Sequence, residues 1–347
     1  MLFGLYSITL VISAFLFSWI GCHVARYLLS SAQLMDEPNE RSNHDTPVPR
    51  GGGIAVMTSI VGFLCVAGTP STLLLAATGI AIISFMDDRG GISIKWRLLI
   101  QTLAVLLLFL PNGMIATVFD GPVFQGLLSP LADKLLAGFL LIGFMNLFNF
   151  MDGIDGITGV ETISIGLGLF ILSFFVVGIR ILGVEGLILA SAIAGFLWLN
   201  WHPAKLFLGD VGSVALGFLL GFFLLQLAAE GYWAAALILP AYYLVDGGLT
   251  FLKRLFTGEK VWEAHSQHAY QKAVRSGYGH DWVVIRIGSL NVALVVLAVF
   301  ACVEPAYALQ FTAAAYGISL VGWFILLNAK KPATQTIITP QGNALST

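Results

Sequence analysis

Amide and carboxylate side chains recur at regular spacing between residues 146 and 159, in an otherwise apolar chain. Asn146, Asn149, Asp152 and Asp155 follow one another at three-residue intervals, with glycines between and after them. Steps of three residues drift by about 60° around an α-helix, so these side chains do not share one helical face. The spacing indicates a helix end that runs into a glycine-shaped loop. Such a loop gathers carboxylate and amide oxygens around a small volume, which suits a divalent cation and phosphate groups. A glycine turn with side-chain caps is the alternative, and it accounts for one aspartate better than for the whole set.

Three further aspartates could take part in the same kind of chemistry. Asp87 and Asp88 are adjacent at the end of an apolar segment, and a buried pair of carboxylates needs a cation or a shared proton. A solvated helix end is the alternative. Asp210 lies at the expected start of a helix, as a candidate metal ligand, and Gly212 and Ser213 behind it offer N–H groups to phosphate. The alternative at Asp210 is an ordinary helix N-cap.

Basic and histidine residues supply groups that bind anions. Arg50 precedes the glycine run 51–53, where free N–H groups at a helix start predict an anion site that Arg50 can clamp. A juxtamembrane arginine without such a role is equally consistent. His265 and His268 are three residues apart and can share a helical face, which suits phosphate binding or proton transfer better than zinc. Asp246 lies near the end of an apolar segment, where an ionisable group is a functional candidate.

The composition indicates what carries these residues. The chain is 58% apolar and only 10% charged, whereas soluble domains carry roughly 25% charged residues. We therefore expect an all-α polytopic membrane protein with one integral membrane domain over residues 1–330. Residues 331–347 are expected to form a polar, mobile cytoplasmic tail.

Runs without charge predict about eleven membrane-spanning helices, with ten as the alternative count, because a span needs about 20 apolar residues. The expected spans are about 2–24, 53–68, 71–86, 98–112, 133–148, 160–178, 184–201, 213–229, 233–251, 283–302 and 306–328.

Basic residues predict the orientation. If the N-terminus is periplasmic, fifteen of the 17 lysines and arginines fall on the cytoplasmic side together with the C-terminus, which is a strong positive-inside bias. The long loops on that side contain every polar cluster described above. These loops are about 25–52, 87–97, 149–159, 202–212 and 252–282.

Taken together, the motifs resemble the polyprenyl-phosphate N-acetylhexosamine-1-phosphate transferase family, in the order that the family has them over about residues 36–275. The family segment N-x-x-N-x-x-D-G-x-D-G matches residues 146–156, and its paired aspartates match Asp87 and Asp88. Its N-x-x-P-A-K-x-F-x-G-D-x-G-S segment matches residues 200–213, and P-x-P-R-G-G-G matches residues 47–53.

Two features depart from the family pattern. Arg89-Gly90-Gly91 follows the aspartate pair, where many members have a lysine or another polar residue. The histidine loop is H-S-Q-H-A-Y-Q instead of H-x-H-H. The second departure is closer to the branch that initiates O-antigen synthesis than to the peptidoglycan translocase.

The resemblance implies a transferase of the bacterial inner membrane. It would move an N-acetyl-aminosugar 1-phosphate from a UDP-sugar to undecaprenyl phosphate and release UMP, initiating O-antigen or another cell-surface polysaccharide. Mg²⁺ is the implied cofactor, with Mn²⁺ as the alternative. The implied partners are undecaprenyl phosphate, a UDP-N-acetyl sugar and the bilayer. A homodimer is left open, and no nucleic acid is expected.

The resemblance also implies residue roles. Asp210 would be a direct metal ligand, and Asp152 and Asp155 would support the metal or the diphosphate. Asp87 or Asp88 would deprotonate or position the lipid phosphate. Asn200 would contact uracil. The remaining expected substrate contacts are Arg50, His265, His268, Asn146, Asn149, Lys205, Gly212 and Ser213.

Several alternatives stay open from the sequence. An ion-coupled transporter is the rival class, although its carboxylates would be expected near the bilayer midplane in inverted repeats. A CDP-alcohol phosphotransferase is disfavoured because its D-G-x-x-A-R signature is absent. The sugar (GlcNAc, GalNAc, FucNAc or QuiNAc) is open, as is a direct or two-step transfer.

Overall fold

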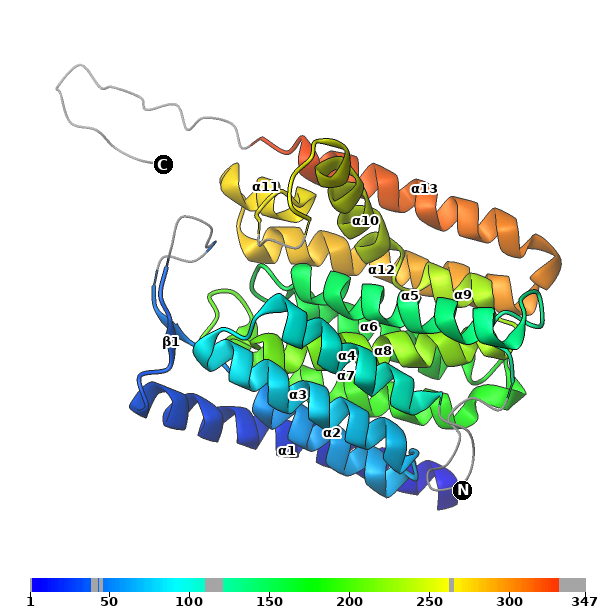
Figure 1. The fold of residues 1–347 in the computed structure, drawn as a ribbon, viewed down its shortest axis with the longest axis horizontal. Coiled ribbons are helices and arrows are strands. Elements are labelled where there is room, and N and C mark those ends of the chain that lie inside the picture. Colours follow the sequence, from blue (N-terminus) through cyan, green and yellow to red (C-terminus); the bar gives the residue numbers. More distant parts are fainter. Residues whose placement is uncertain (1, 39–42, 44–45, 110–120, 262–264, 331–347) are drawn as a thin grey trace.

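Long helices lie side by side in one bundle in the computed structural model of the chain (Figure 1). It describes residues 2–38, 43, 46–109, 121–261 and 265–330. Apolar segments form helices because a backbone in lipid must satisfy its own N–H and C=O groups. The helices are α1 (Leu2–Ser31), α2 (Gly53–Ala67), α3 (Ser71–Gly90), α4 (Ile94–Leu108), α5 (Pro130–Phe150), α6 (Ile157–Leu172), α7 (Arg180–Asn200), α8 (Asp210–Ala229), α9 (Trp233–Ile238), α10 (Ala241–Phe256), α11 (Ala269–Arg275), α12 (His280–Val303) and α13 (Ala308–Leu327), with the short 3₁₀ helices η1 (Val177–Ile179) and η2 (Pro305–Tyr307).

The all-helical, polytopic character expected from the composition is confirmed. Among the described residues, 7 helices are long and apolar enough to cross a membrane, namely α1, α3, α5, α7, α8, α12 and η2 with α13. The apolar helices α2 and α6 are shorter. Every predicted span overlaps a helix, but the count of eleven and the orientation stay predictions. Residues 110–120 and the expected tail 331–347 lie outside the described residues.

One predicted span differs in the structure. Residues 233–251 were expected as one helix, but α9 ends at Ile238 and α10 begins at Ala241. The break coincides with Pro240, which has no N–H group to continue a helical hydrogen-bond ladder. After the break, α10 runs steeply across its neighbours (Figure 1).

The centre of the bundle is α8, which is buried along most of its length and contacts α2, α3, α5 and α9. Its first turn packs directly against the start of α2. A Cβ atom on Gly53 would overlap the backbone of Gly212, so glycine is required for this close approach. The glycine run therefore fixes where α2 begins relative to α8.

The predicted polar loops gather at one end of the bundle. Strands β1 (Met35–Asp36) and β2 (Val48–Pro49) pair there as an antiparallel hairpin, and Arg50 bridges to Phe207. Figure 1 shows β1 and α11 at this same end. Segments that are far apart in the sequence are thus brought around a common space.

Candidate active site

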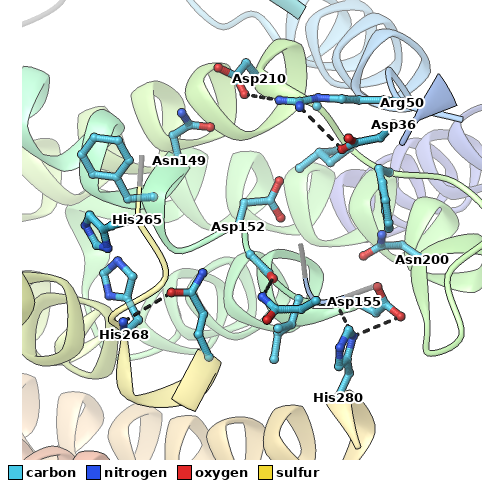
Figure 2. Close-up of a pocket in the computed structure, with 18 of the residues that line it drawn as sticks. Asp36, Arg50, Asn149, Asp152, Asp155, Asn200, Asp210, His265, His268 and His280 are labelled. Atoms are coloured by element: carbon cyan, nitrogen blue, oxygen red, sulfur yellow. Dashed lines mark hydrogen bonds and ion pairs between the residues drawn. The ribbon is translucent and has the colours of Figure 1, made fainter. Parts of the chain in front are cut away.

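A cavity of about 450 Å³ lies among these loops. In Figure 2, Asp152 lies at the centre of the cavity. Arg50 and Asp210 lie on one side of it, Asp155 and His280 on another, and His265 and His268 on a third. The lining residues are Asp36, Asn43, Arg50, Arg97, Asn149, Phe150, Asp152, Gly153, Ile154, Asp155, Asn200, Phe207, Leu208, Gly209, Asp210, His265, His268, Gln271 and His280.

Asp152 projects from the loop between α5 and α6. Gly156 ends this loop with φ of 80°, a left-handed conformation that favours glycine. Thr158 on the first turn of α6 donates a hydrogen bond to Asp152 Oδ1 at 2.6 Å. Burial raises the pKa of Asp152 to about 6, with further contributions from the negative charges of Asp210 and Asp88. A carboxylate in this surrounding is stabilised by an incoming cation.

Asp210 is the first residue of α8, and Asp88 holds that helix end in place. The Asp88 carboxylate accepts the backbone N–H groups of Asp210 and Val211, each at 3.1 Å. The Asp88 side chain is only 5% exposed and does not line the cavity. Asp88, at the end of α3, therefore caps the N-terminus of α8. It also forms an ion pair with Arg50, whose Nε lies 2.9 Å from Asp88 Oδ1.

Arg50 connects three carboxylates at the cavity. Besides Asp88, it contacts Asp210 Oδ1 at 2.7 Å and Asp36 Oδ2 at 3.6 Å. The N–H groups of residues 51–53, which the sequence suggested as an anion site, instead donate to the carbonyls of Phe207 and Leu208. The arginine side chain thus remains as the anion-binding group of this motif.

Asp87, the other member of the pair, faces away from the main cavity. It accepts the Ile92 N–H at 2.5 Å and pairs with Arg97 at 2.9 Å. Arg97 lines the cavity and lies 3.9 Å from Asp210 Oδ2. Each aspartate of the pair therefore holds one arginine that faces the site.

Asp155 has a different surrounding from Asp152. Its Oδ2 lies 2.6 Å from His202 Nδ1 and 3.2 Å from His280 Nδ1, and it accepts the Ala204 N–H at 3.1 Å. Burial would raise the pKa of Asp155, but its hydrogen bond and charge contact with His280, and its hydrogen bond with His202, outweigh burial and lower it. The Asp155 carboxylate therefore links its own loop to the loop that contains His202 and Ala204 and to the start of α12 at His280.

Asn200 joins two of the same loops. Its Oδ1 accepts the Gly156 N–H at 2.9 Å, and its Nδ2 donates to the Leu206 carbonyl at 3.0 Å. Both ends of the amide are therefore engaged with backbone, although the residue lines the cavity.

His265 and His268 lie side by side, with ring centroids 4.9 Å apart. Burial lowers the pKa of His265 to about 4, and the nearby His268 and Arg254 add to this effect. His265 is therefore neutral at pH 7 and suits hydrogen bonding to phosphate more than charge pairing.

The remaining sequence-predicted residues lie around the cavity instead of on its wall, except Asn149. Asn149 lines it and accepts a hydrogen bond from Ser213 Oγ. Asn146 pairs with Gln101 at 2.8 Å, and the Gly212 and Ser213 N–H groups bond to the Gly209 carbonyl. Lys205 is exposed and does not line the cavity.

Sequence reasoning missed five lining residues with polar side chains: Asp36, Asn43, Arg97, Gln271 and His280. Each stands in a loop or helix end on the predicted cytoplasmic side, which is the one signal that marks them. Asn43 donates to the Gly153 carbonyl at 2.9 Å and so joins the first loop to the Asp152 loop.

The donor set suits a hard divalent cation. Asp152 and Asp210 present carboxylate oxygens to the same cavity, and such oxygens are the ligands that Mg²⁺ prefers. The cavity leaves room for the waters that Mg²⁺ retains. The residues present therefore fit the metal that the sequence resemblance implies.

The fold and the site define an integral membrane protein with a polar, charge-rich cavity at one end of its helical bundle. Over residues 71–228 the chain matches glycosyl transferase family 4. It is 29% identical over 291 residues to the undecaprenyl-phosphate alpha-N-acetylglucosaminyl 1-phosphate transferase of Escherichia coli, covering 77% of this chain and 76% of the relative.

Two other relatives have related names. One is a probable undecaprenyl-phosphate N-acetylglucosaminyl 1-phosphate transferase of Bacillus subtilis, 26% identical with 73% of each chain covered. The other is the decaprenyl-phosphate N-acetylglucosaminephosphotransferase of Mycobacterium tuberculosis, 28% identical with 80% of this chain and 78% of the relative covered. These matches support the polyprenyl-phosphate N-acetylhexosamine-1-phosphate transferase family that the sequence motifs predict. The chain is a multi-pass inner-membrane protein, and the transporter alternative finds no support.

Proposed function

We propose that this chain transfers an N-acetyl-aminosugar 1-phosphate from a UDP-sugar to undecaprenyl phosphate, releasing UMP. The product would start O-antigen or another cell-surface polysaccharide. The observation that carries the proposal is the cavity wall itself, where carboxylates of Asp152 and Asp210 face guanidinium groups of Arg50 and Arg97. That mixture suits a diphosphate together with a divalent cation.

Each group has a task in this reaction. Arg50 and Arg97 bind phosphate oxygens and hold the two phosphorus centres near each other. Neutral His265 adds a hydrogen bond to a phosphate. Asp152 and Asp210 hold Mg²⁺, which when bound neutralises charge on the diphosphate and on the departing UMP. Gathering the two substrates in one cavity supplies the proximity that the transfer needs.

The membrane explains where the cavity lies. Undecaprenyl phosphate keeps its head at the bilayer surface, and a charged UDP-sugar arrives from water. A polar cavity at one end of an apolar bundle is where the two can meet, and we place it at the cytoplasmic face on the basis of the basic residues.

The central test replaces the expected metal ligand. We expect Asp210→Asn to lower UMP release from UDP-sugar and undecaprenyl phosphate by about 100-fold, corresponding to roughly 2.7 kcal/mol of barrier. Purified protein in detergent is assayed over a range of Mg²⁺ concentrations, with Asp133→Asn as the control. Asp133 is a buried aspartate (3% exposed) near the start of α5, and it accepts the N–H groups of Val123 and Phe124, away from the cavity.

Activity of Asp210→Asn within a few-fold of the parent protein would remove Asp210 from the metal site. A panel of radiolabelled UDP-sugars, each offered with undecaprenyl phosphate, identifies the sugar. Absence of UMP release with every member of the panel would contradict the proposed reaction.

A further inference from the structure

A buried carboxylate on α10 lies behind the cavity wall and has no part in the reaction described above. Asp246 is fully buried. Its oxygens accept hydrogen bonds from the backbone N–H groups of Ala269 at 3.0 Å and Tyr270 at 3.3 Å, and from the hydroxyl groups of Tyr242 at 3.0 Å and Thr250 at 3.4 Å. Donors surround it on several sides, so the carboxylate is held in one orientation.

Asp246 also contacts a histidine that lines the cavity. His268 Nδ1 lies 3.4 Å from Asp246 Oδ1, and the His268 side chain is 3% exposed. Its ring is stacked on Tyr270 with centroids 5.5 Å apart, while His265 lies on it at 4.9 Å. The ring is therefore fixed by packing as well as by its contact with Asp246.

Both ring nitrogens of His268 are buried, and neither makes a hydrogen bond within the described part of the chain. Nδ1 has the Asp246 carboxylate 3.4 Å away, so Nε2 is the nitrogen left for a ligand, and His268 forms part of the cavity wall. A buried polar atom without a partner is costly unless a ligand satisfies it. The substrate cavity is the place from which such a ligand would come.

Two neighbours compete for the His268 side chain. It contacts Asp246, and it also faces the backbone N–H of Gln271 in a capping-box arrangement. The first contact needs a proton on Nδ1, whereas accepting from Gln271 needs a lone pair. The proton position on one ring nitrogen is set by the bond that it makes, and a carboxylate is the stronger partner.

We propose that Asp246 is a positioning residue that fixes His268 with Nδ1–H toward α10 and an unprotonated Nε2 toward the cavity. There Nε2 accepts a hydrogen bond from a hydroxyl or P–OH group of the substrate. This role rests on the proposed transfer reaction for its effect on turnover, but the proton position on His268 is a property of the protein alone.

The first experiment needs no turnover. NMR of protein labelled with ¹⁵N-histidine, assigned by His268→Gln, reports which nitrogen of His268 carries the proton. We expect Nδ1–H in the parent protein and a changed tautomer in Asp246→Asn, with no change in Asp133→Asn. A proton on Nε2 in the neutral imidazole of the parent protein would overturn the inference whatever the reaction proves to be.

The second experiment is a double-mutant cycle on UMP release. We expect Asp246→Asn to lower kcat by about tenfold or more with KM for the UDP-sugar nearly unchanged, because an interaction of the reacting complex is lost. His268→Gln should lower kcat at least as much, and the double variant no further, since Asp246 acts through His268. Independent, multiplying losses would mean that Asp246 is structural only and would overturn the inference.

Folding is monitored by thermal unfolding in detergent. If Asp246→Asn does not fold, Tyr242→Phe replaces it, because that change removes only one donor to Asp246 Oδ2. We expect Tyr242→Phe to lower kcat less than Asp246→Asn does, and to cause no further loss in protein that already carries His268→Gln. An equal loss of kcat with and without His268→Gln would contradict the inference. Absence of UMP release by the parent protein would defeat the proposed function and leave the NMR result standing.

Discussion

Two aspartates of one loop have opposite pKa shifts because their neighbours differ. Burial raises the pKa of Asp152 to about 6, and the negative charges of Asp210 and Asp88 add to this effect. Three residues later, the contacts of Asp155 with His280 and His202 outweigh burial and lower its pKa. Since the two residues have the same side chain and similar motif positions, both could be nominated from the sequence. Their different surroundings, a cavity proposed to bind a cation for Asp152 and contacts that join loops for Asp155, could not be predicted from it.

Asp155 should make stability depend on pH. Its pKa in the folded protein lies below the ordinary value of 3.8, so its stabilising effect is present above about pH 4 and is lost as pH falls through the folded pKa. We expect Asp155→Asn to lower the free energy of unfolding by about 1–3 kcal/mol at neutral pH. The difference from the parent protein should shrink below pH 4 in thermal unfolding.

Asp133→Asn is measured in parallel, as a control for effects of low pH on the unfolding measurement itself. A difference between the parent protein and Asp155→Asn that stays constant down to pH 3 would contradict the assigned role of the pKa shift.

At the level of helices, the site depends on where α8 begins. Asp88 on α3 accepts the first N–H groups of α8, and Gly53 on α2 packs against Gly212 on its first turn. The helices themselves follow from apolar runs in the sequence. The hydrogen-bond partners of Asp88 cannot be predicted in this way. They lie at the start of a helix 122 residues further along the chain, and only three-dimensional packing brings the two together.

A methyl group at position 53 tests this packing. We expect Gly53→Ala to destabilise the protein by about 1–3 kcal/mol and to reduce UMP release, because the added Cβ pushes α2 away from the end of α8 that carries Asp210. Gly62→Ala is a matched control in the same helix, since the space around its Cβ is open. Thermal unfolding and activity are measured for both.

Equal behaviour of the two alanine variants would show that the contact between α2 and α8 does not set the geometry of the site.

At the level of the whole molecule, the residues of the cavity gather at one end of an apolar bundle. The charge asymmetry of the loops allowed this gathering to be predicted without any knowledge of contacts. Asp36 and His280 were missed because nothing in the sequence distinguishes them from the other polar residues near them, and their place in the site depends on neighbours in space. The break between α9 and α10 was also missed, because a hydropathy reading does not register what Pro240 does to the backbone.

Labelling of single cysteines tests the predicted orientation. Lys330, just after α13, and Lys134 in α5 are both exposed and belong to opposite predicted sides. With Cys65 replaced by serine, we expect Lys134→Cys to react with a membrane-impermeant maleimide in spheroplasts. Lys330→Cys should react only after the membrane is opened.

The reverse labelling pattern would place the cavity at the outer face and would contradict access by a cytoplasmic UDP-sugar. Cys22 and Cys302 are buried and provide the background measurement.

The contacts of Arg50 with both Asp88 and Asp210 have an evolutionary consequence. A neutral residue at position 50 would leave two carboxylates without their shared counter-charge, and a change at either aspartate would leave the guanidinium unbalanced. Single exchanges at these three positions are therefore disfavoured in a lineage that must keep the site. Among relatives that keep it, positions 50, 88 and 210 should be retained together.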